Sequence, residues 1–290
     1  MYLILIYVLH PNMIVMYVLI SPCILHPMLR AEGITTEEDL KAFARCIERC
    51  RKFGIEIREL PCPETKMLGL PRAPGPFAGR MDTPECMEQM DDLEKTVRQQ
   101  IETELPAALI GVNSSPTCGA TMTYYTEEKT KGRGAFLKRF SDIPATDVYD
   151  FAKYRIYLAA PLFSAGERAF NKIIAERLTS LFYSVHLPQE LDDDASAREM
   201  SREDMIYHTN LEALKNADIV VGVIDGADAD SGTAWEMGYA SALGKRVIAL
   251  RTDFRRFSER EDVNLMLESE AEVCHSADEL FELLDPFKMQ

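Results

Sequence analysis

Short apolar runs alternate with longer amphipathic segments along most of this 290-residue chain. Residues 16–20, 55–60 and 107–112 have the length of strands, and the first and last of these runs are apolar enough to be buried. Residues 35–53 have helical spacing. Strands that alternate with helices favour parallel sheets covered by helices. Because the alternation starts afresh in the second half of the chain, we expect two α/β domains, each with a mainly parallel sheet flanked by helices. We expect the second to be flavodoxin- or Rossmann-like.

The pattern also sets the predicted domain boundaries. Residues 1–15 form an apolar N-terminal extension, residues 16–145 the first domain and residues 153–290 the second. The apolar start is broken by His10-Pro11-Asn12 and no basic residue precedes it. This pattern is typical of neither a membrane span nor a signal peptide, so we expect no membrane association.

Charge and cysteine content narrow the class of protein. A net charge of -15 argues against an extended nucleic-acid surface, because neutralising many phosphates requires clustered Lys and Arg. A single nucleotide needs only a local basic pocket and stays compatible with this charge. The seven cysteines, an odd number without a secretory signal, indicate a reducing cytoplasmic compartment with free or metal-bound thiols.

Three cysteines follow the three predicted strands of the first domain. Cys23, Cys62 and Cys118 each lie near a proline shortly after an apolar run. The carboxyl ends of parallel strands share one edge of a sheet, so these thiols can converge although they are far apart in sequence. Three thiolates would suit an iron-sulfur cluster with one iron left open for chemistry. The alternative is three buried structural cysteines, because free cysteine is often buried.

Charged residues near the second of these cysteines are candidates for catalysis and binding. Glu64 lies two residues after Cys62, where it could act as general acid or base, or be an exposed loop acid. Arg72 and Arg80 lie in the proline- and glycine-rich stretch 69–84. A loop of that length is commonly functional, and its two cations are candidates for binding a phosphate or a pyrimidine oxygen.

The second domain contains an acidic loop that leads into a helix. Asp225 and Asp230 follow an apolar strand, and Ser231-Gly232-Thr233 opens the segment that carries Glu236. Acids at this edge could hold sugar hydroxyls, a base edge or magnesium, and a carboxylate one turn into the helix could be aimed at an anomeric carbon. Helix capping by Asp230 and Ser231 explains part of the pattern but not Glu236.

Residues 153–290 resemble the nucleoside 2-deoxyribosyltransferase family. The resemblance is carried by residues 157–163, by Ala217-Asp218 and by residues 225–239. It implies that Glu236 is the nucleophile and that Asp230 holds the base. Tyr157 and Asp225 would be further residues of the nucleoside site. Asn264 would reach the site of a neighbouring subunit in a homo-oligomer.

One position departs from the pattern of that family. Asn210 stands where an aspartate is expected on the helix before Ala217-Asp218. An amide cannot act as a proton-transferring acid, although it can still bind a nucleotide.

Residues 16–140 resemble the thiouracil desulfidase (TudS) family. The resemblance lies at Cys23, Cys62-Pro63-Glu64, residues 69–72 and residues 115–119. It implies a 4Fe-4S cluster held by Cys23, Cys62 and Cys118, with Glu64 and Ser115 as proton-transfer partners.

Together the two resemblances imply an iron-sulfur-dependent desulfidase. It would convert a 4-thiouracil-type base, nucleoside or nucleotide to the uracil form and release hydrogen sulfide, without net redox chemistry. The alternative is a nucleoside 2-deoxyribosyltransferase or N-glycosidase with Glu236 as nucleophile. A third hypothesis is a nucleotide-sensing module in which the cluster acts as a redox switch.

Overall fold

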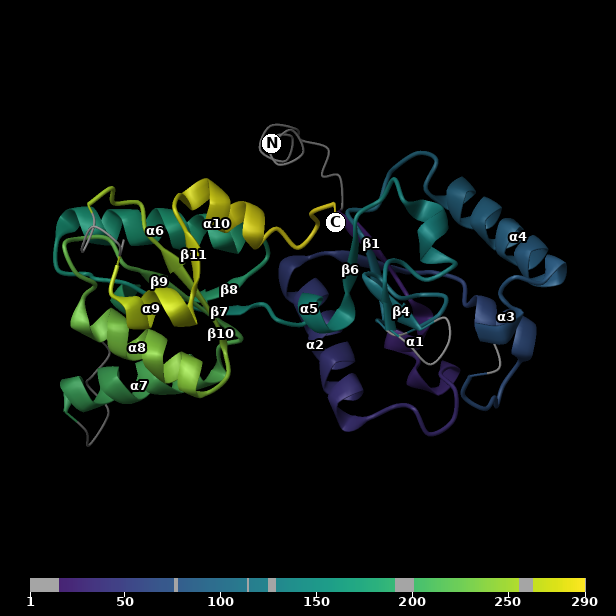
Figure 1. The fold of residues 1–290 in the computed structure, drawn as a ribbon, viewed down its shortest axis with the longest axis horizontal. Coiled ribbons are helices and arrows are strands. Elements are labelled where there is room, and N and C mark those ends of the chain that lie inside the picture. The colour runs from purple at the N-terminus through teal and green to yellow at the C-terminus, as the bar shows by residue number, and fades with distance from the viewer. Residues whose placement is uncertain are drawn as a thin grey trace. The chain divides into compact units, whose positions relative to one another are not determined.

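A computed structural model describes residues 16–75, 78–113, 115–124, 129–190, 201–255 and 263–289 (Figure 1). The predicted N-terminal extension, residues 1–15, lies outside the described residues. Among the described helices, none is both long enough and apolar enough to span a membrane.

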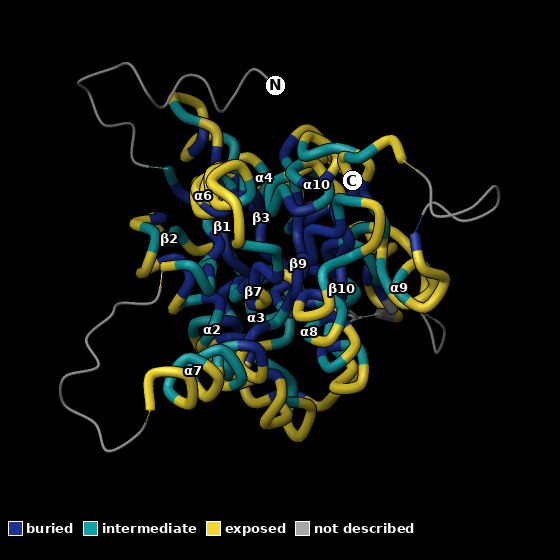
Figure 2. The backbone as a smooth tube through the Cα atoms, turned by 90° about the vertical axis from the view of Figure 1, so that its left-hand side faces the viewer, coloured by how far each residue is buried: buried dark blue, intermediate teal, exposed yellow. Residues whose placement is uncertain are grey.

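The first sheet has four parallel strands in the order β2-β1-β3-β6. The strands are β1 (Tyr17–Ile20), β2 (Glu56–Glu59), β3 (Leu109–Gly111) and β6 (Ala145–Asp147). The inner strands β1 and β3 are buried along their whole length, whereas β2, which forms an edge, is half-exposed (Figure 2). A continuous apolar run therefore forms the inner strands, and a charged run forms the edge.

Two long helices lie in the connections between strands of the first sheet, and the local sequence explains where each helix begins. Helix α2 (Glu37–Phe53) begins after Thr36, which exchanges hydrogen bonds with Asp39 in a capping box, and ends at Gly54 with φ 67°. Helix α4 (Pro84–Gln100) begins after Thr83, whose side chain accepts a hydrogen bond from Cys86 N. Such caps satisfy backbone groups that would otherwise lack partners and contribute roughly 1 kcal/mol each.

Short elements fill the connections of the first sheet. They are α1 (Pro22–Leu25), η2 (Pro27–Leu29), α3 (Pro63–Leu68), η3 (Ala78–Arg80), the antiparallel hairpin β4 (Met122–Tyr124) and β5 (Lys129–Lys131), η4 (Leu137–Phe140) and α5 (Val148–Phe151).

The second sheet has five parallel strands in the order β11-β10-β9-β7-β8. The strands are β7 (Arg155–Ala159), β8 (Ser184–His186), β9 (Ile219–Val223), β10 (Arg246–Leu250) and β11 (Glu272–Cys274). Five helices and one 3-10 turn connect or flank them: α6 (Ala165–Ser180), η5 (Pro188–Glu190), α7 (Arg202–Asn216), α8 (Ser231–Ala242), α9 (Leu265–Glu270) and α10 (Ala277–Leu283). Numbered within the sheet, the order is 2-1-3-4-5, as in flavodoxin-like folds. The predicted fold class is confirmed.

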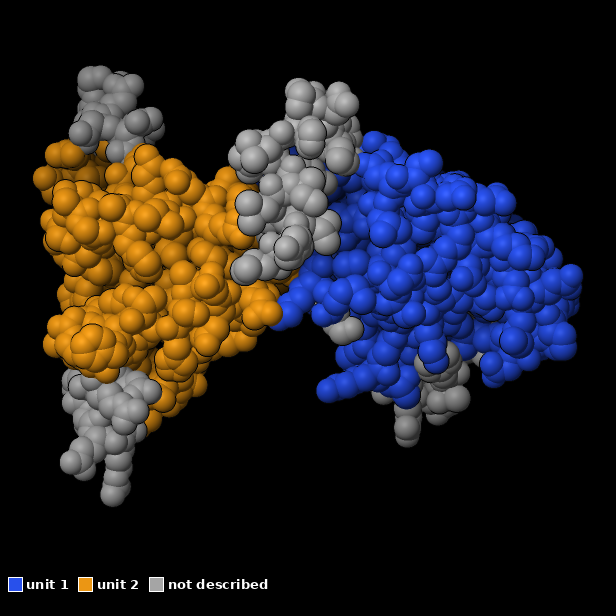
Figure 3. All heavy atoms as spheres, turned by 90° about the horizontal axis from the view of Figure 1, so that it is seen from above, with its two compact units in different colours: residues 1–152, 286–290 blue, residues 153–285 orange. Residues whose placement is uncertain are grey.

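The chain divides into two compact units (Figure 3). Unit 1 contains the residues up to Ala152 and those from Pro286 onward, and unit 2 contains Lys153–Asp285. The predicted second domain ran to residue 290, whereas the C-terminal residues return to unit 1. There the Phe287 ring lies 6.1 Å from that of Phe151, measured between centroids, because a half-buried aromatic residue finds an apolar partner in that core.

Candidate functional sites

The three predicted cysteines follow the three adjacent strands β2, β1 and β3 of unit 1. Cys23 lies in α1 directly after β1, Cys62 caps the N-terminus of α3 after β2, and Cys118 lies in the turn after β3. In a sheet of order 2-1-3-4 the connections from β1 and β3 leave in opposite directions, which opens a crevice at their carboxyl ends. The topology thus brings the three thiols to one edge.

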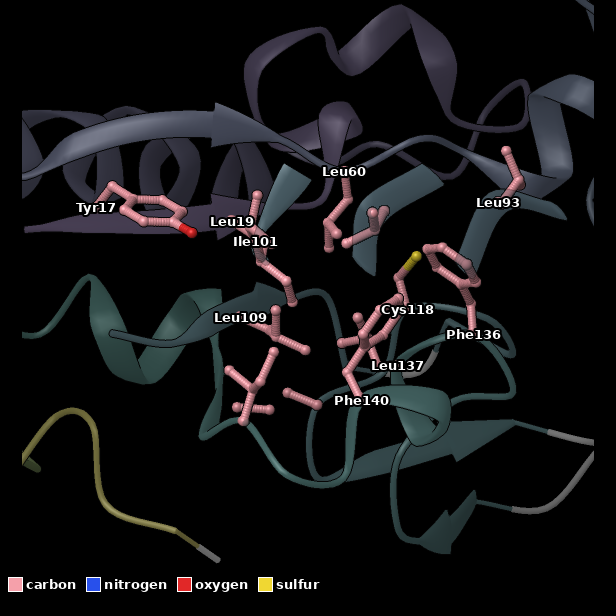
Figure 4. Packing of buried hydrophobic residues seen from close by; sticks show 14 residues of the cluster. Tyr17, Leu19, Leu60, Leu93, Ile101, Leu109, Cys118, Phe136, Leu137 and Phe140 are labelled. Atoms are coloured by element: carbon pink, nitrogen blue, oxygen red, sulfur yellow. The ribbon is translucent and has the colours of Figure 1, made fainter. Parts of the chain in front are cut away.

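Burial and the neighbouring thiols both affect the pKa values of these cysteines. Burial and then the nearby Cys62 raise the pKa of Cys23 to about 12. Burial, followed by Cys62 and Cys23, raises the pKa of Cys118 far above its usual range. Figure 4 shows Cys118 packed in the apolar core with Leu60, Phe136 and other residues of its cluster. Three thiolates without counter-charges would be costly in these surroundings.

Within the described ranges, no three or more His, Cys, Asp or Glu side chains are placed to hold one metal ion.

Glu64 lies beside the thiols and is held by three side chains. Its Oε2 accepts a hydrogen bond from Arg72 at 3.2 Å, and its Oε1 accepts from Thr117 at 2.7 Å and from Ser115 at 3.4 Å. Both carboxylate oxygens therefore accept hydrogen bonds within this network. Thr117 is 1% exposed and was not predicted as a site residue, although it lies within the same Pro116-Thr117-Cys118 segment.

Ser115 and Thr65 connect this carboxylate to the cysteines. Ser115 Oγ accepts hydrogen bonds from Cys118 N at 3.0 Å and Thr117 N at 3.3 Å, so this side chain also shapes the turn that presents Cys118. Thr65 donates from its hydroxyl to Cys62 Sγ at 3.2 Å and accepts from Arg72 at 3.0 Å. One network thus joins Glu64, Ser115 and Arg72 to the thiol of Cys62 and to the backbone of Cys118.

Two buried polar atoms of this region lack a partner among the described residues. They are Ser21 Oγ, two residues before Cys23, and Arg72 Nε. Buried donors are normally satisfied, so two unsatisfied ones beside three thiols fit a group that accepts hydrogen bonds there. Arg80, by contrast, lies exposed in η3, and no hydrogen bond of its side chain to another described residue joins it to this network.

In unit 2 a buried tyrosine pairs with the predicted nucleophile. Tyr157 lies in β7, one of the two strands at the switch point of the second sheet, and its hydroxyl donates a very short hydrogen bond to Glu236 Oε1 in α8. Burial raises the pKa of Glu236, the Tyr157 hydroxyl lowers it, and nearby Asp230 raises it. Burial and Glu236 raise the pKa of Tyr157 far above its usual range, so this hydroxyl stays protonated.

The two loop aspartates of the predicted nucleoside site differ in their hydrogen bonds. Asp230 caps α8 through Oδ2, which accepts from Thr233 N at 3.1 Å, and its Oδ1 accepts from none of the described residues. Asp225 accepts from Thr252 N at 2.5 Å, from the Thr252 hydroxyl at 2.6 Å and from Asp253 N at 2.9 Å. Asp225 therefore ties two loops together, whereas Asp230 keeps one oxygen free beside Glu236.

Sequence reasoning missed one residue of this site. The Nε2 atom of His186, at the end of β8, lies 2.9 Å from Oδ1 of Asn210 in α7. The His186 ring also stacks on Tyr157, with centroids 5.3 Å apart and an interplanar angle of 20°. The position that departs from the expected aspartate is therefore part of the same cluster of side chains.

Asn264 lies at the N-terminus of α9. Its Oδ1 accepts a hydrogen bond from Met266 N at 3.0 Å, and the residue is exposed. With Asp228, Ser231 and residues of α8 and α9, it lines a pocket of roughly 620 Å³.

Comparison with known proteins identifies the family of unit 2. The profile of the nucleoside 2-deoxyribosyltransferase family matches residues 156–278. A relative from Ureaplasma parvum serovar 3, Uncharacterized protein UU063, is 31% identical over 125 residues, which cover 38% of this chain and 78% of the relative.

Two solved structures are also similar. A 2-deoxyribosyltransferase from Bacillus psychrosaccharolyticus is 27% identical, with a TM-score of 0.38, and the match covers 44% of this chain and 90% of that one. A conserved protein from Enterococcus faecalis V583 is 30% identical, with a TM-score of 0.39, over 45% of this chain and 96% of that one.

Proposed function

Since the chain belongs to a family of proteins with a nucleoside 2-deoxyribosyltransferase-like domain, we propose that unit 2 breaks the N-glycosidic bond of a nucleoside or nucleotide. The observation that carries this proposal is the pairing of Tyr157 with the buried Glu236 at the switch point of the second sheet. Crevices at such points are the usual ligand sites of open α/β sheets.

The roles of the side chains follow from their surroundings. Glu236 is the nucleophile that attacks C1′ of the sugar. Burial makes its carboxylate less solvated and more reactive, while the Tyr157 hydroxyl holds it in one orientation. The free Oδ1 of Asp230 is available to bind the base or a sugar hydroxyl.

A covalent trap tests this role of Glu236. Nucleosides with a 2-fluoro sugar form glycosyl-enzyme esters that hydrolyse slowly, because fluorine destabilises the cationic transition state. We expect intact-mass spectrometry to show one sugar adduct per chain, located on the peptide that contains Glu236. Glu236→Gln should remove the adduct, and Glu176→Gln, an exposed glutamate in α6, should retain it. An adduct on another residue, or base release without any adduct, would contradict the nucleophilic role.

Asn264 enters the proposal as a residue of a neighbouring subunit. Its exposed position at the end of α9 leaves it accessible to a second copy of the chain. We expect Asn264→Ala and Glu236→Gln each to be inactive alone and to regain part of the activity when mixed. No recovery in a mixed oligomer would place Asn264 outside the active site.

The thiol cluster of unit 1 supports a second proposed activity, the removal of sulfur from a 4-thiouracil-type base, nucleoside or nucleotide. Three converging thiols match the soft ligands that iron-sulfur clusters require. The unsatisfied Ser21 Oγ and Arg72 Nε add hydrogen-bond donors, which commonly surround the sulfur atoms of such clusters.

In this proposal Cys23, Cys62 and Cys118 hold a 4Fe-4S cluster, which would supply a Lewis-acidic iron for the sulfur of the thiocarbonyl group. Glu64, fixed by Arg72 and Thr117, accepts a proton from the water that attacks the ring carbon. Ser115 orients this carboxylate and the turn of Cys118 together. Arg72 contributes the cation closest to Glu64, and Arg80 remains a candidate for binding a phosphate or a pyrimidine oxygen of the substrate.

Iron and acid-labile sulfide, measured per chain after anaerobic purification, test the cluster. We expect about four of each in the unmodified protein. Cys118→Ala should lose them, whereas Cys86→Ala, a buried cysteine of α4 outside the thiol cluster, should keep them. No iron after attempted reconstitution would contradict this activity and leave the proposal for unit 2 unaffected.

A further inference from the structure

His186 is held against the tyrosine that binds the nucleophile. It is the register partner of Tyr157 in the parallel pair β7 and β8, and the two rings stack. The imidazole is half-buried. Four elements, β7, β8, α7 and α8, therefore place Tyr157, His186, Asn210 and Glu236 in one cluster of side chains.

Asn210 determines which nitrogen of His186 is free. A carbonyl oxygen only accepts hydrogen bonds, so the contact of 2.9 Å between Nε2 and Asn210 Oδ1 requires a hydrogen on Nε2. Nδ1 has no hydrogen bond to any other described residue. It therefore accepts a proton when the ring is neutral and donates one when the ring is charged.

The amide at position 210 places no charge beside the ring. It orients the imidazole through a neutral hydrogen bond, whereas a carboxylate in that place would form an ion pair with an imidazolium. Histidine is the side chain that most often transfers protons in catalysis, and Nδ1 of His186 has no partner among the described residues that would compete for this role.

Breaking an N-glycosidic bond needs such a group, because a nucleobase leaves poorly unless it is protonated. The Tyr157 hydroxyl already donates its hydrogen bond to Glu236, and the Asn210 amide cannot transfer a proton. We propose that His186 is the general acid and base of the site in unit 2, in place of the acid that is missing at position 210. The inference rests on the proposed glycosidic activity and deepens it.

The steps balance with water as the only co-reactant. The Glu236 carboxylate forms a bond to C1′ while the bond from C1′ to the base nitrogen breaks, and the Nδ1 proton of His186 passes to the departing base. Water then attacks C1′, its proton passes to Nδ1, and Glu236 leaves as a carboxylate. A second nucleobase in place of water gives transfer instead of hydrolysis.

Leaving-group dependence tests the proposal, with 2′-deoxyuridine and 5-fluoro-2′-deoxyuridine, or their 5′-monophosphates, as probes. Fluorine makes the departing base more acidic, so it needs less help from a general acid. For His186→Gln we expect kcat with the deoxyuridine substrate to fall about 10²- to 10³-fold, and kcat with the fluorinated substrate to fall at least tenfold less. Glu236→Gln is the control and should lower both rates equally.

A second variant separates proton transfer from packing. His186→Phe keeps a ring that can stack on Tyr157 but transfers no proton, so it should reproduce the substrate dependence of His186→Gln. Equal losses on both substrates in the two variants would overturn the role of His186 and leave Glu236 as nucleophile intact. A chain without substitutions that cleaves neither probe would overturn the inference together with the proposed glycosidic activity.

Uracil binding provides a readout without turnover. Trp235 is the only tryptophan of the chain and precedes Glu236, so its fluorescence should report binding of uracil in unit 2. The affinity of His186→Phe should stay within about threefold of that of the unmodified protein if His186 acts on the proton. A loss of binding as large as the loss of kcat would assign His186 to base recognition instead.

Discussion

Numbered along the chain within each sheet, the first four strands of both large sheets have the order 2-1-3-4. The candidate sites of the two units are nevertheless built on different kinds of element. In unit 1 the cysteines lie in the connections that follow the strands. In unit 2 Tyr157 lies within a strand and Glu236 within a helix. Connections can bring several soft ligands around one volume, whereas a strand and a helix fix one carboxylate for one bond. One topology thus carries two different arrangements of candidate side chains.

The two carboxylates show the same contrast in their partners. Glu64 accepts hydrogen bonds from Arg72, Thr117 and Ser115. Glu236 accepts from Tyr157 alone among the described residues. The first carboxylate is held from several sides, and the second depends on one hydroxyl.

The largest expected effects come from substitutions that test whether the two sites act independently. We expect Glu236→Ala to lower glycosidic cleavage at least about 10³-fold and to leave sulfide release unchanged. Cys62→Ala should do the reverse, because it removes a ligand from unit 1 only. Chromatographic assays of free base and of sulfide check both. Loss of both activities in either variant would show that the sites act in sequence on one substrate.

The third strand of each unit contains a glycine whose surroundings differ in rigidity. A Cβ on Gly111 would overlap the backbone oxygen of Cys118 and lie 2.8 Å from Leu137 Cδ1. A Cβ on Gly222 would overlap the side chain of Met237, which can rotate away. We expect Gly111→Ala to cost about 3 kcal/mol of unfolding free energy and Gly222→Ala about 1 kcal/mol.

Urea unfolding checks this difference, with circular dichroism for the whole chain and Trp235 fluorescence for unit 2. Equal losses of stability in the two variants would contradict the difference in rigidity.

Removal of a hydroxyl should be more harmful at Tyr157 than at Thr117, because Tyr157 is the single described partner of Glu236. We therefore compare Tyr157→Phe with Thr117→Val. Activity requires the ionised carboxylate, and the substitution removes the hydrogen bond that lowers the pKa of Glu236 while burial still raises it. The acidic limb of the kcat/KM profile should therefore move to higher pH. At pH 7 we expect a loss of about tenfold or more, because hydrogen bonds to charged groups contribute about 1.5–3 kcal/mol. An unmoved acidic limb would remove Tyr157 as the group that tunes Glu236.

The matched deletion in unit 1, Thr117→Val, should have the smallest effect. Glu64 loses its shortest hydrogen bond but keeps Arg72 and Ser115, so we expect sulfide release to fall only about threefold to fivefold with the iron content unchanged. Thr117→Ser should restore the rate. A loss larger than that of Tyr157→Phe in its own assay would reverse the order drawn from the number of partners.

The sequence predicted at which edge of each sheet the candidate residues lie, but not which side chains contact one another there. The thiols after β1, β2 and β3 could be placed together because parallel strands share their carboxyl edge. The partnership of Thr117 with Glu64 depends on how a turn folds back, and that of His186 with Tyr157 depends on strand register. Neither is encoded in local spacing. Spacing also does not reveal that Asp225 accepts hydrogen bonds from the neighbouring loop.

The return of Phe287 to the core of unit 1 has a consequence for the order of events during synthesis. A chain that emerges from its amino end exposes Phe151 long before Phe287 exists, so the aromatic pair of unit 1 closes only after the whole of unit 2 has been made. Domains usually fold as they emerge, one after the other. Here one contact of the domain that is made first can form only after unit 2 has been synthesised.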